Sequence, residues 1–165
     1  MKKKLFGIAL LFMMVIAFTA CGVYLPNYGE KDYVATYYKG LYYTNADAPK
    51  EALISSEQAL KKYRETAQFS KKGSREAVYT QFTKRLDSYS AKYFEENMLI
   101  AILHTASSGS YTYAVQSFEA QGSTLNVTLK ETNSTGNILT DDLQIWSILI
   151  ECPKVNYTRL NVEYV

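Results

Sequence analysis

The chain has 165 residues, of which 18 are Lys or Arg and 16 are Asp or Glu, so its formal net charge at pH 7 is +2. This length suits one domain with a real hydrophobic core. So small a charge, with no basic block after residue 20, excludes general electrostatic attraction for nucleic acid.

The first 22 residues are typical of a bacterial lipoprotein signal peptide. Three lysines at positions 2–4 precede an uncharged apolar run from Leu5 to Ala20, and Cys21 and Gly22 follow it. The run is shorter than the roughly 20 residues of a transmembrane helix, although an uncleaved anchor helix remains the alternative. We therefore expect residues 1–20 to be a signal peptide and Cys21 to be the lipidated residue.

Cleavage before Cys21 has three consequences. It removes three lysines and leaves 15 basic against 16 acidic residues, a formal charge of −1. Acyl chains on Cys21, worth about 0.8 kcal/mol per buried CH₂, hold the protein at the extracytoplasmic face of the cell membrane. Cys152 is then left without a disulfide partner, so we expect the fold to depend on packing alone.

The segment after the lipid site divides into a tether and a tyrosine-rich strand. Residues 21–32 contain Pro26, Asn27 and Gly29 and show no periodicity, which predicts a tether. Residues 33–43 (YVATYYKGLYY) favour a strand. An aromatic platform that binds glycans or a partner is the alternative interpretation of these tyrosines.

Two helices are predicted next. Ser55 with Gln58 fits a capping box at the start of the first helix. The second helix is predicted from about Ser74 to Leu86. The apolar stripes of the two helices are Leu60, Tyr63 and Ala67 in the first and Val78, Phe82 and Leu86 in the second.

From residue 98 the hydrophobic period changes to two, which predicts strands. The pattern predicts a tight turn at residues 121–123 and strands at 98–105, 111–119, 125–129, 143–152 and 160–165. We expect a single domain over residues 33–165 of the α+β class, with two N-terminal helices packed on a mostly antiparallel β-sheet.

The residues that often carry chemistry do not form a recognisable catalytic or metal motif. His104, the single histidine, shares a strand face with Ile100 and Ile102, and Cys152 lies in an apolar strand. A Cys152–His104 dyad would need an open, electropositive pocket around the thiol. One histidine and one remaining thiol give no metal-ligand spacing. The sequence therefore predicts no enzyme activity, no metal and no cofactor.

One stretch resembles a known family. Tyr93-Phe94-Glu95-Glu96-Asn97 is followed by the strand MLIAILHT, by Ser107-Ser108-Gly109-Ser110-Tyr111 and later by Thr140-Asp141-Asp142 and WSILIE. This order resembles the C-terminal domain of the protease-complex subunit PrcB family, over about residues 93–154. The resemblance implies a non-catalytic surface lipoprotein that associates with a secreted protease complex and helps it to assemble or persist.

A second, looser resemblance keeps another function open. A small-residue turn ending in an aromatic, with a Trp on a later strand, is similar to chagasin-type inhibitors of cysteine proteases. The residues that would then enter a protease cleft are Ser108, Gly109, Tyr111 and Trp146.

The predicted partner-binding surface consists of two loops. Loops on a rigid sheet commonly carry recognition, and a glycine lets a backbone approach closely. We therefore expect the 105–112 turn to face the 131–142 loop. The candidate contact residues are Ser108, Gly109, Ser110, Tyr111, Asp141 and Asp142.

Overall fold

The computed structural model describes residues 33–133 and 142–165; the predicted signal peptide, Cys21 and the tether lie outside them. Of the described residues, 49% are in strands and 22% in three short helices, and the strands form three sheets. The expected α+β class, with two N-terminal helices on one sheet, is therefore wrong. The fold is mostly β, and three strands precede the first described helix.

The main sheet has four strands in the order β1-β8-β5-β3, all antiparallel to their neighbours. The central strands are β5 (Asn97–Ala106) and β8 (Gln144–Pro153). The edges are β1 (Val34–Lys39) and β3 (Glu51–Ile54). The strands predicted in 33–43, 98–105 and 143–152 are confirmed, whereas β3 was not predicted.

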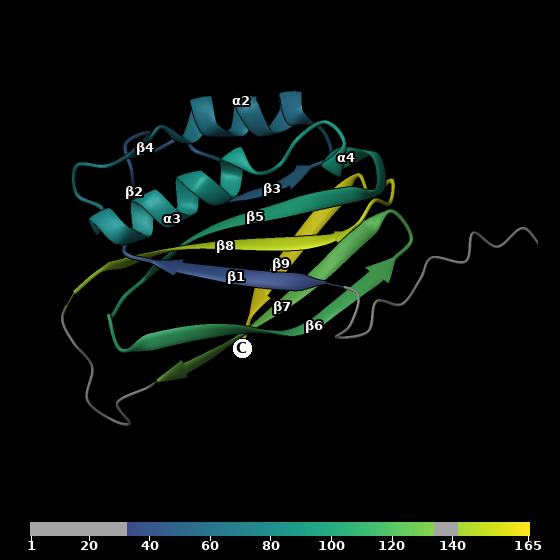
Figure 1. Ribbon diagram of the computed structural model, residues 1–165. Coiled ribbons are helices and arrows are strands. Elements are labelled where there is room, and N and C mark those ends of the chain that lie inside the picture. The colour runs from purple at the N-terminus through teal and green to yellow at the C-terminus, as the bar shows by residue number, and fades with distance from the viewer. Residues whose placement is uncertain (1–32, 134–141) are drawn as a thin grey trace, which may run out of the picture.

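Helices cover one face of this sheet (Figure 1). They are α2 (Glu57–Ala67), α3 (Glu76–Asp87) and the single turn α4 (Tyr93–Glu96). Beside them, β2 (Tyr42–Tyr43) and β4 (Phe69–Ser70) form a two-stranded sheet.

The helices begin at other residues than predicted, whereas the predicted apolar stripes do face the core. The N-cap of α2 is Ser56, whose side chain accepts a hydrogen bond from the Ala59 N–H at 3.1 Å, so the capping box at Ser55 is wrong by one residue. The predicted stripe of α2 is buried, as are Phe82 and Leu86 of α3.

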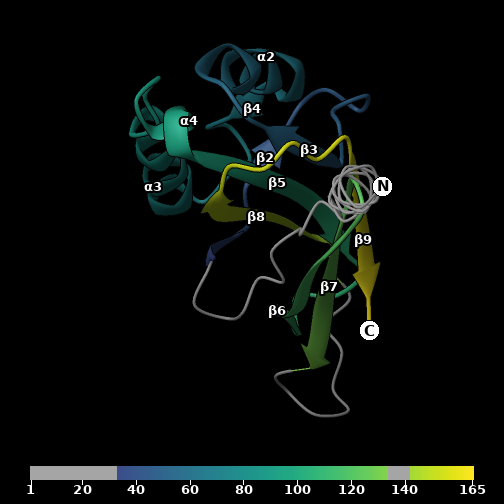
Figure 2. The ribbon, with the colours of Figure 1, turned by 90° about the vertical axis from the view of Figure 1, so that its right-hand side faces the viewer.

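A second sheet covers the opposite face of the main sheet (Figure 2). It contains β6 (Tyr111–Gln121), β7 (Thr124–Asn133) and β9 (Arg159–Tyr164), in the order β6-β7-β9. Gly122, with φ +60°, makes the predicted tight turn between β6 and β7. After β7 the chain returns to the main sheet as β8 and only then enters the second sheet as β9, which pairs parallel to β7. The strands after residue 98 therefore do not form a single antiparallel meander.

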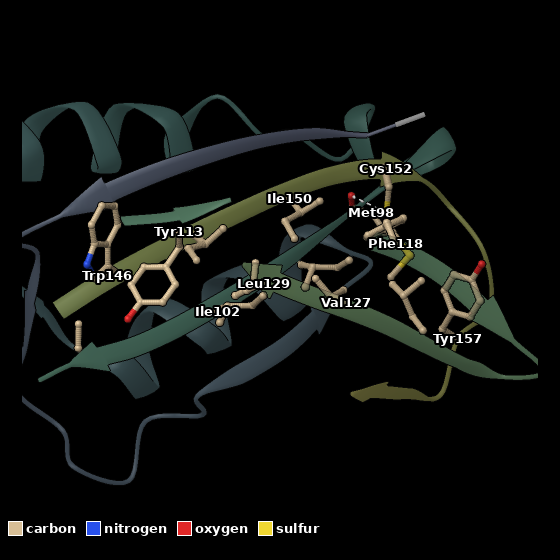
Figure 3. Close-up of a cluster of buried hydrophobic side chains, with 14 residues drawn as sticks. Met98, Ile102, Tyr113, Phe118, Val127, Leu129, Trp146, Ile150, Cys152 and Tyr157 are labelled. Carbon is tan, nitrogen blue, oxygen red and sulfur yellow. Dashed lines mark hydrogen bonds between the residues drawn. The ribbon is translucent and has the colours of Figure 1, made fainter. Parts of the chain in front are cut away.

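The core has two layers, one on each face of β5 and β8. Leu99, Ala101 and Leu149 face the helices and pack with residues such as Phe82. The alternate side chains face the second sheet (Figure 3); they are Met98, Ile100, Ile102, Ile148 and Ile150, which pack against Leu125, Val127 and Leu129. Because side chains alternate along a strand, two apolar layers require strands that are apolar at every position.

A hydrogen bond at a β-bulge in β6 connects the second sheet to β1 of the main sheet. The β6–β7 register shifts between Val115 and Ser117. At this place the Val115 N–H donates to the hydroxyl oxygen of Tyr37 in β1 at 2.9 Å. The hydroxyl thus satisfies a backbone donor at an irregular point of the ladder.

We predict that Tyr37→Phe destabilises the fold by about 1–3 kcal/mol, because the partly buried Val115 N–H loses its acceptor. The measurement is the free energy of unfolding in urea. Tyr42→Phe is the matched control, since Tyr42 is 44% exposed. Equal stability of the two variants would contradict the proposed role of the hydroxyl.

Candidate functional site

The turn between β5 and β6 is built differently from the predicted contact surface. Ser108 and Ser110 are only 2% and 3% exposed, and the Ser110 N–H donates to Ser108 Oγ at 3.1 Å. Gly109 and Tyr111 are partly exposed. The two serines therefore shape the turn. Of the four predicted residues only Gly109 and Tyr111 are accessible, and the Tyr111 side chain also packs against the core.

Asp142 faces this turn, as the sequence predicted for the second loop. Its carboxylate accepts hydrogen bonds from the Gly109 N–H at 3.0 Å and from Gln144 Nε2 at 2.8 Å. A Cβ on Gly109 would lie 2.6 Å from Asp142 Oδ2, which is too close for any real contact. A larger residue at 109 would therefore displace the carboxylate of the exposed Asp142 side chain and break its contact with the turn. Asp141, the neighbouring predicted residue, lies outside the described part of the chain.

Lys39, at the end of β1, completes the arrangement. Its ammonium group donates to the Gly109 carbonyl and lies 5.5 Å from the centre of the Trp146 ring, within the range of a cation–π contact. Next to Asp142, the side chain of Leu143 is 74% exposed. We call these residues the end surface: Lys39, Gly109, Tyr111, Asp142 and Leu143. Sequence reasoning missed Lys39 and Leu143, because neither belongs to a motif.

Behind the end surface, His104 takes part in a hydrogen-bonded cluster. Tyr113 donates to Glu131 Oε2 at 2.7 Å, and His104 Nε2 lies 3.0 Å from the same phenol oxygen. Because the Tyr113 proton goes to Glu131, Nε2 is the donor in the histidine contact. The imidazole also stacks on Tyr164, with the ring centres 4.3 Å apart. The cluster thereby connects β5, β6, β7 and β9.

The environment of the cluster determines its protonation. Burial lowers the pKa of His104, and the Glu131 carboxylate opposes this by raising it. Burial, reinforced by Glu131, raises the pKa of Tyr113. Burial also raises the pKa of Tyr164 to about 12. At neutral pH the cluster therefore holds a neutral imidazole between two protonated phenols, a packing role for His104.

Cys152 lies at the opposite end of the main sheet. In the β5–β8 register Cys152 pairs with Met98 and Trp146 pairs with His104, so six residues, about 20 Å, separate the thiol from the imidazole along the sheet. Figure 3 shows Cys152 and Trp146 at opposite ends of β8. Burial raises the pKa of the thiol to about 12. A Cys152–His104 dyad does not form.

The aromatic residues singled out in the sequence serve mainly in packing. Trp146 is 6% exposed and meets Tyr113 edge-on, with the ring centres 5.4 Å apart, so it is not displayed on a loop as an inhibitor would require. Tyr38 is buried and Tyr37 is partly buried. Residues 33–43 thus form strands, not a continuous aromatic platform.

Within residues 33–133 and 142–165, no group of three or more His, Cys, Asp or Glu side chains is placed to hold a metal ion. The helices of this part are all too short or too polar to span a membrane. No protein-family model, curated protein or solved structure matches the chain. The resemblance to the PrcB family therefore stays a prediction.

We predict that stability falls as the pH is lowered from about 6.5, the ordinary histidine value. Because the pKa of His104 is lowered in the folded state, the unfolded chain binds the proton more readily, and acid favours unfolding until the pH passes below the folded pKa. His104→Gln should remove this slope in the free energy of unfolding. His104 is the only histidine, so an unchanged slope in the variant would contradict the assignment.

Proposed function

We propose that this protein is a membrane-anchored, extracytoplasmic bacterial lipoprotein that acts as a non-catalytic binding or accessory module. The basic head, short apolar run and Cys21 of the sequence support the anchor. The partly buried imidazole, which is hydrogen-bonded to Tyr113 and stacked on Tyr164, and the distant, protonated thiol support a non-catalytic role.

The observation that carries the binding proposal is the exposed Leu143 on a fixed surface. A leucine with 74% exposure contributes nothing to the core of this chain, whereas its neighbour Asp142 is held by Gly109 and Gln144. Covering this leucine with a partner would remove apolar surface from water, which favours association. Lys39 and Asp142 add one charge of each sign beside it, which favours a specific orientation of the partner.

For the partner we propose a protein of a secreted protease complex. The support is the resemblance of residues 93–154 to the PrcB family, which includes the 107–111 turn and Asp142 of the end surface. The module would then hold or stabilise that complex at the membrane.

We predict that a photoreactive amino acid in place of Leu143, in the full chain expressed in its own cells, crosslinks to a discrete extracytoplasmic protein. The same group in place of Thr80, an exposed residue of α3, is the control and should not capture this protein. Tyr111→Ala should reduce the product at position 143, because Tyr111 is the partly exposed aromatic residue of the end surface. The crosslinks are read by mass spectrometry.

Three results would contradict the binding proposal. The first is that the probes at positions 143 and 80 capture the same proteins, and the second is that the probe at 143 gives no crosslinked product. The third is that the Tyr111→Ala variant, with an unfolding curve that matches the wild type, gives as much product as the wild type.

A further inference from the structure

The outer edge of β1 is open within the described residues, because β1 is the last strand of the main sheet and pairs only with β8. The Gly40 N–H donates to the Ile145 carbonyl at 2.8 Å, which continues the β1–β8 register. Since antiparallel pairs alternate, the backbone groups of residues 34, 36 and 38 point toward β8. Those of Ala35 and Tyr37 therefore point outward, where an added strand would pair.

Two hollows, each of about 300 Å³, lie along this edge. The first lies between β1 and α3 and is lined by Tyr38, Gln81, Lys84, Arg85 and Ser88. The second begins at the start of β1 and extends over the ends of β8 and β5; it is lined by Tyr33, Val34, Tyr93, Asn97, Glu151, Cys152 and Pro153. α3 runs above β1 along the same side of the molecule (Figure 1), so the first hollow lies on the helix side of the sheet.

The spacing of the hollows fits an extended peptide. Val34 and Tyr38 are four residues apart, about 13 Å along the strand. They also share a face: Tyr38 packs in the helix-side core, whereas Ala35 and Tyr37 pack on the side of the second sheet. In a strand paired with β1, residue i would therefore lie beside Tyr38 and the first hollow, and residue i+4 would lie beside the exposed Val34.

The lining of the hollows favours different side chains. The α3 hollow has two cations and no carboxylate among its lining residues. The Arg85 guanidinium is already bound to Glu151, whereas Lys84 has no ion-pair partner among the described residues. This hollow suits an acidic side chain. The second hollow contains the Glu151 carboxylate and the Asn97 amide beside its apolar side chains. An apolar side chain is favoured at this end because it would cover Val34, which is 58% exposed.

We propose that the open edge of β1 binds an extended peptide segment of a partner protein by strand addition, with an acidic side chain beside Lys84 and an apolar side chain beside Val34. A second copy of this chain fits less well, because its β1, Val34–Lys39, has no carboxylate to offer Lys84. The proposal goes beyond the end surface and does not depend on it.

The test uses the full chain in detergent micelles and the blocked, fluorescent peptide Thr-Glu-Thr-Val-Thr-Ile-Thr. Antiparallel pairing places its glutamate opposite Tyr38 and its isoleucine opposite Val34. We expect the peptide to raise the fluorescence anisotropy at millimolar or lower concentration of protein and to slow amide exchange at Ala35 and Tyr37. N-methylation of the two threonines that flank the valine should abolish binding, whereas N-methylation of the glutamate and isoleucine should not.

A charge exchange tests the α3 hollow. Lys84→Glu should weaken binding of the peptide about fivefold and should strengthen binding of the version with lysine in place of glutamate. Lys62→Glu is the control of equal charge, since Lys62 is exposed on α2 and lines neither hollow.

Four outcomes would overturn the proposal: no binding, equal effects of the two N-methylated peptides, equal effects of the two lysine variants, or protection of β1 through self-association without peptide. A Leu143→Glu variant separates this proposal from the proposed function. It should bind the peptide like the wild type even if the end surface has lost its partner.

Discussion

The structure depends on one constraint, which is that β5 and β8 are apolar on both faces. Ile100 and Ile150 are fully buried on one side, and Leu99 and Leu149 are fully buried on the other. A sheet with two such strands at its centre is stable only when both faces are removed from water. The helices cover one face and the second sheet covers the other, so the two coverings need not contact each other.

This constraint also determines where recognition is feasible. The strands that bear the core end together, and their ends bring Lys39, Gly109 and Asp142 within hydrogen-bonding range although they are far apart in the chain. The rigid sheet holds these loop residues in place. Coverage of the two faces leaves the outer edge of β1 without a paired strand among the described residues, beside α3.

The sequence predicted the features that local periodicity encodes. The two-faced apolar strands, the hairpin at Gly122 and the stripe of α2 follow from the order of side chains alone. β3 was missed because its four residues, EALI, are too few to show a period and are ordered by pairing with β5. The division into two sheets was missed because alternation shows that a strand has a buried face but not which sheet it joins.

In the candidate site, too, local sequence patterns predict some contacts and miss those made by the tertiary structure. The approach of the 109 turn to residue 142 was predicted, but the burial of Ser108 and Ser110 was not, because small polar residues in a turn look alike whether they face solvent or the interior. The contact of Lys39 with Gly109 joins residues 70 positions apart, and no local pattern encodes it. Exposure of Leu143 likewise follows only from the tertiary structure.

The proposed function depends on Cys21 as the lipid anchor that holds the domain at the membrane face. The most direct test is mass spectrometry of the N-terminal peptide of the protein purified from the membranes of its own cells. We expect a mature chain that begins at Cys21 and carries a diacylglyceryl group on its sulfur. A chain that keeps residues 1–20, or a Cys21 with an unmodified thiol, would contradict it.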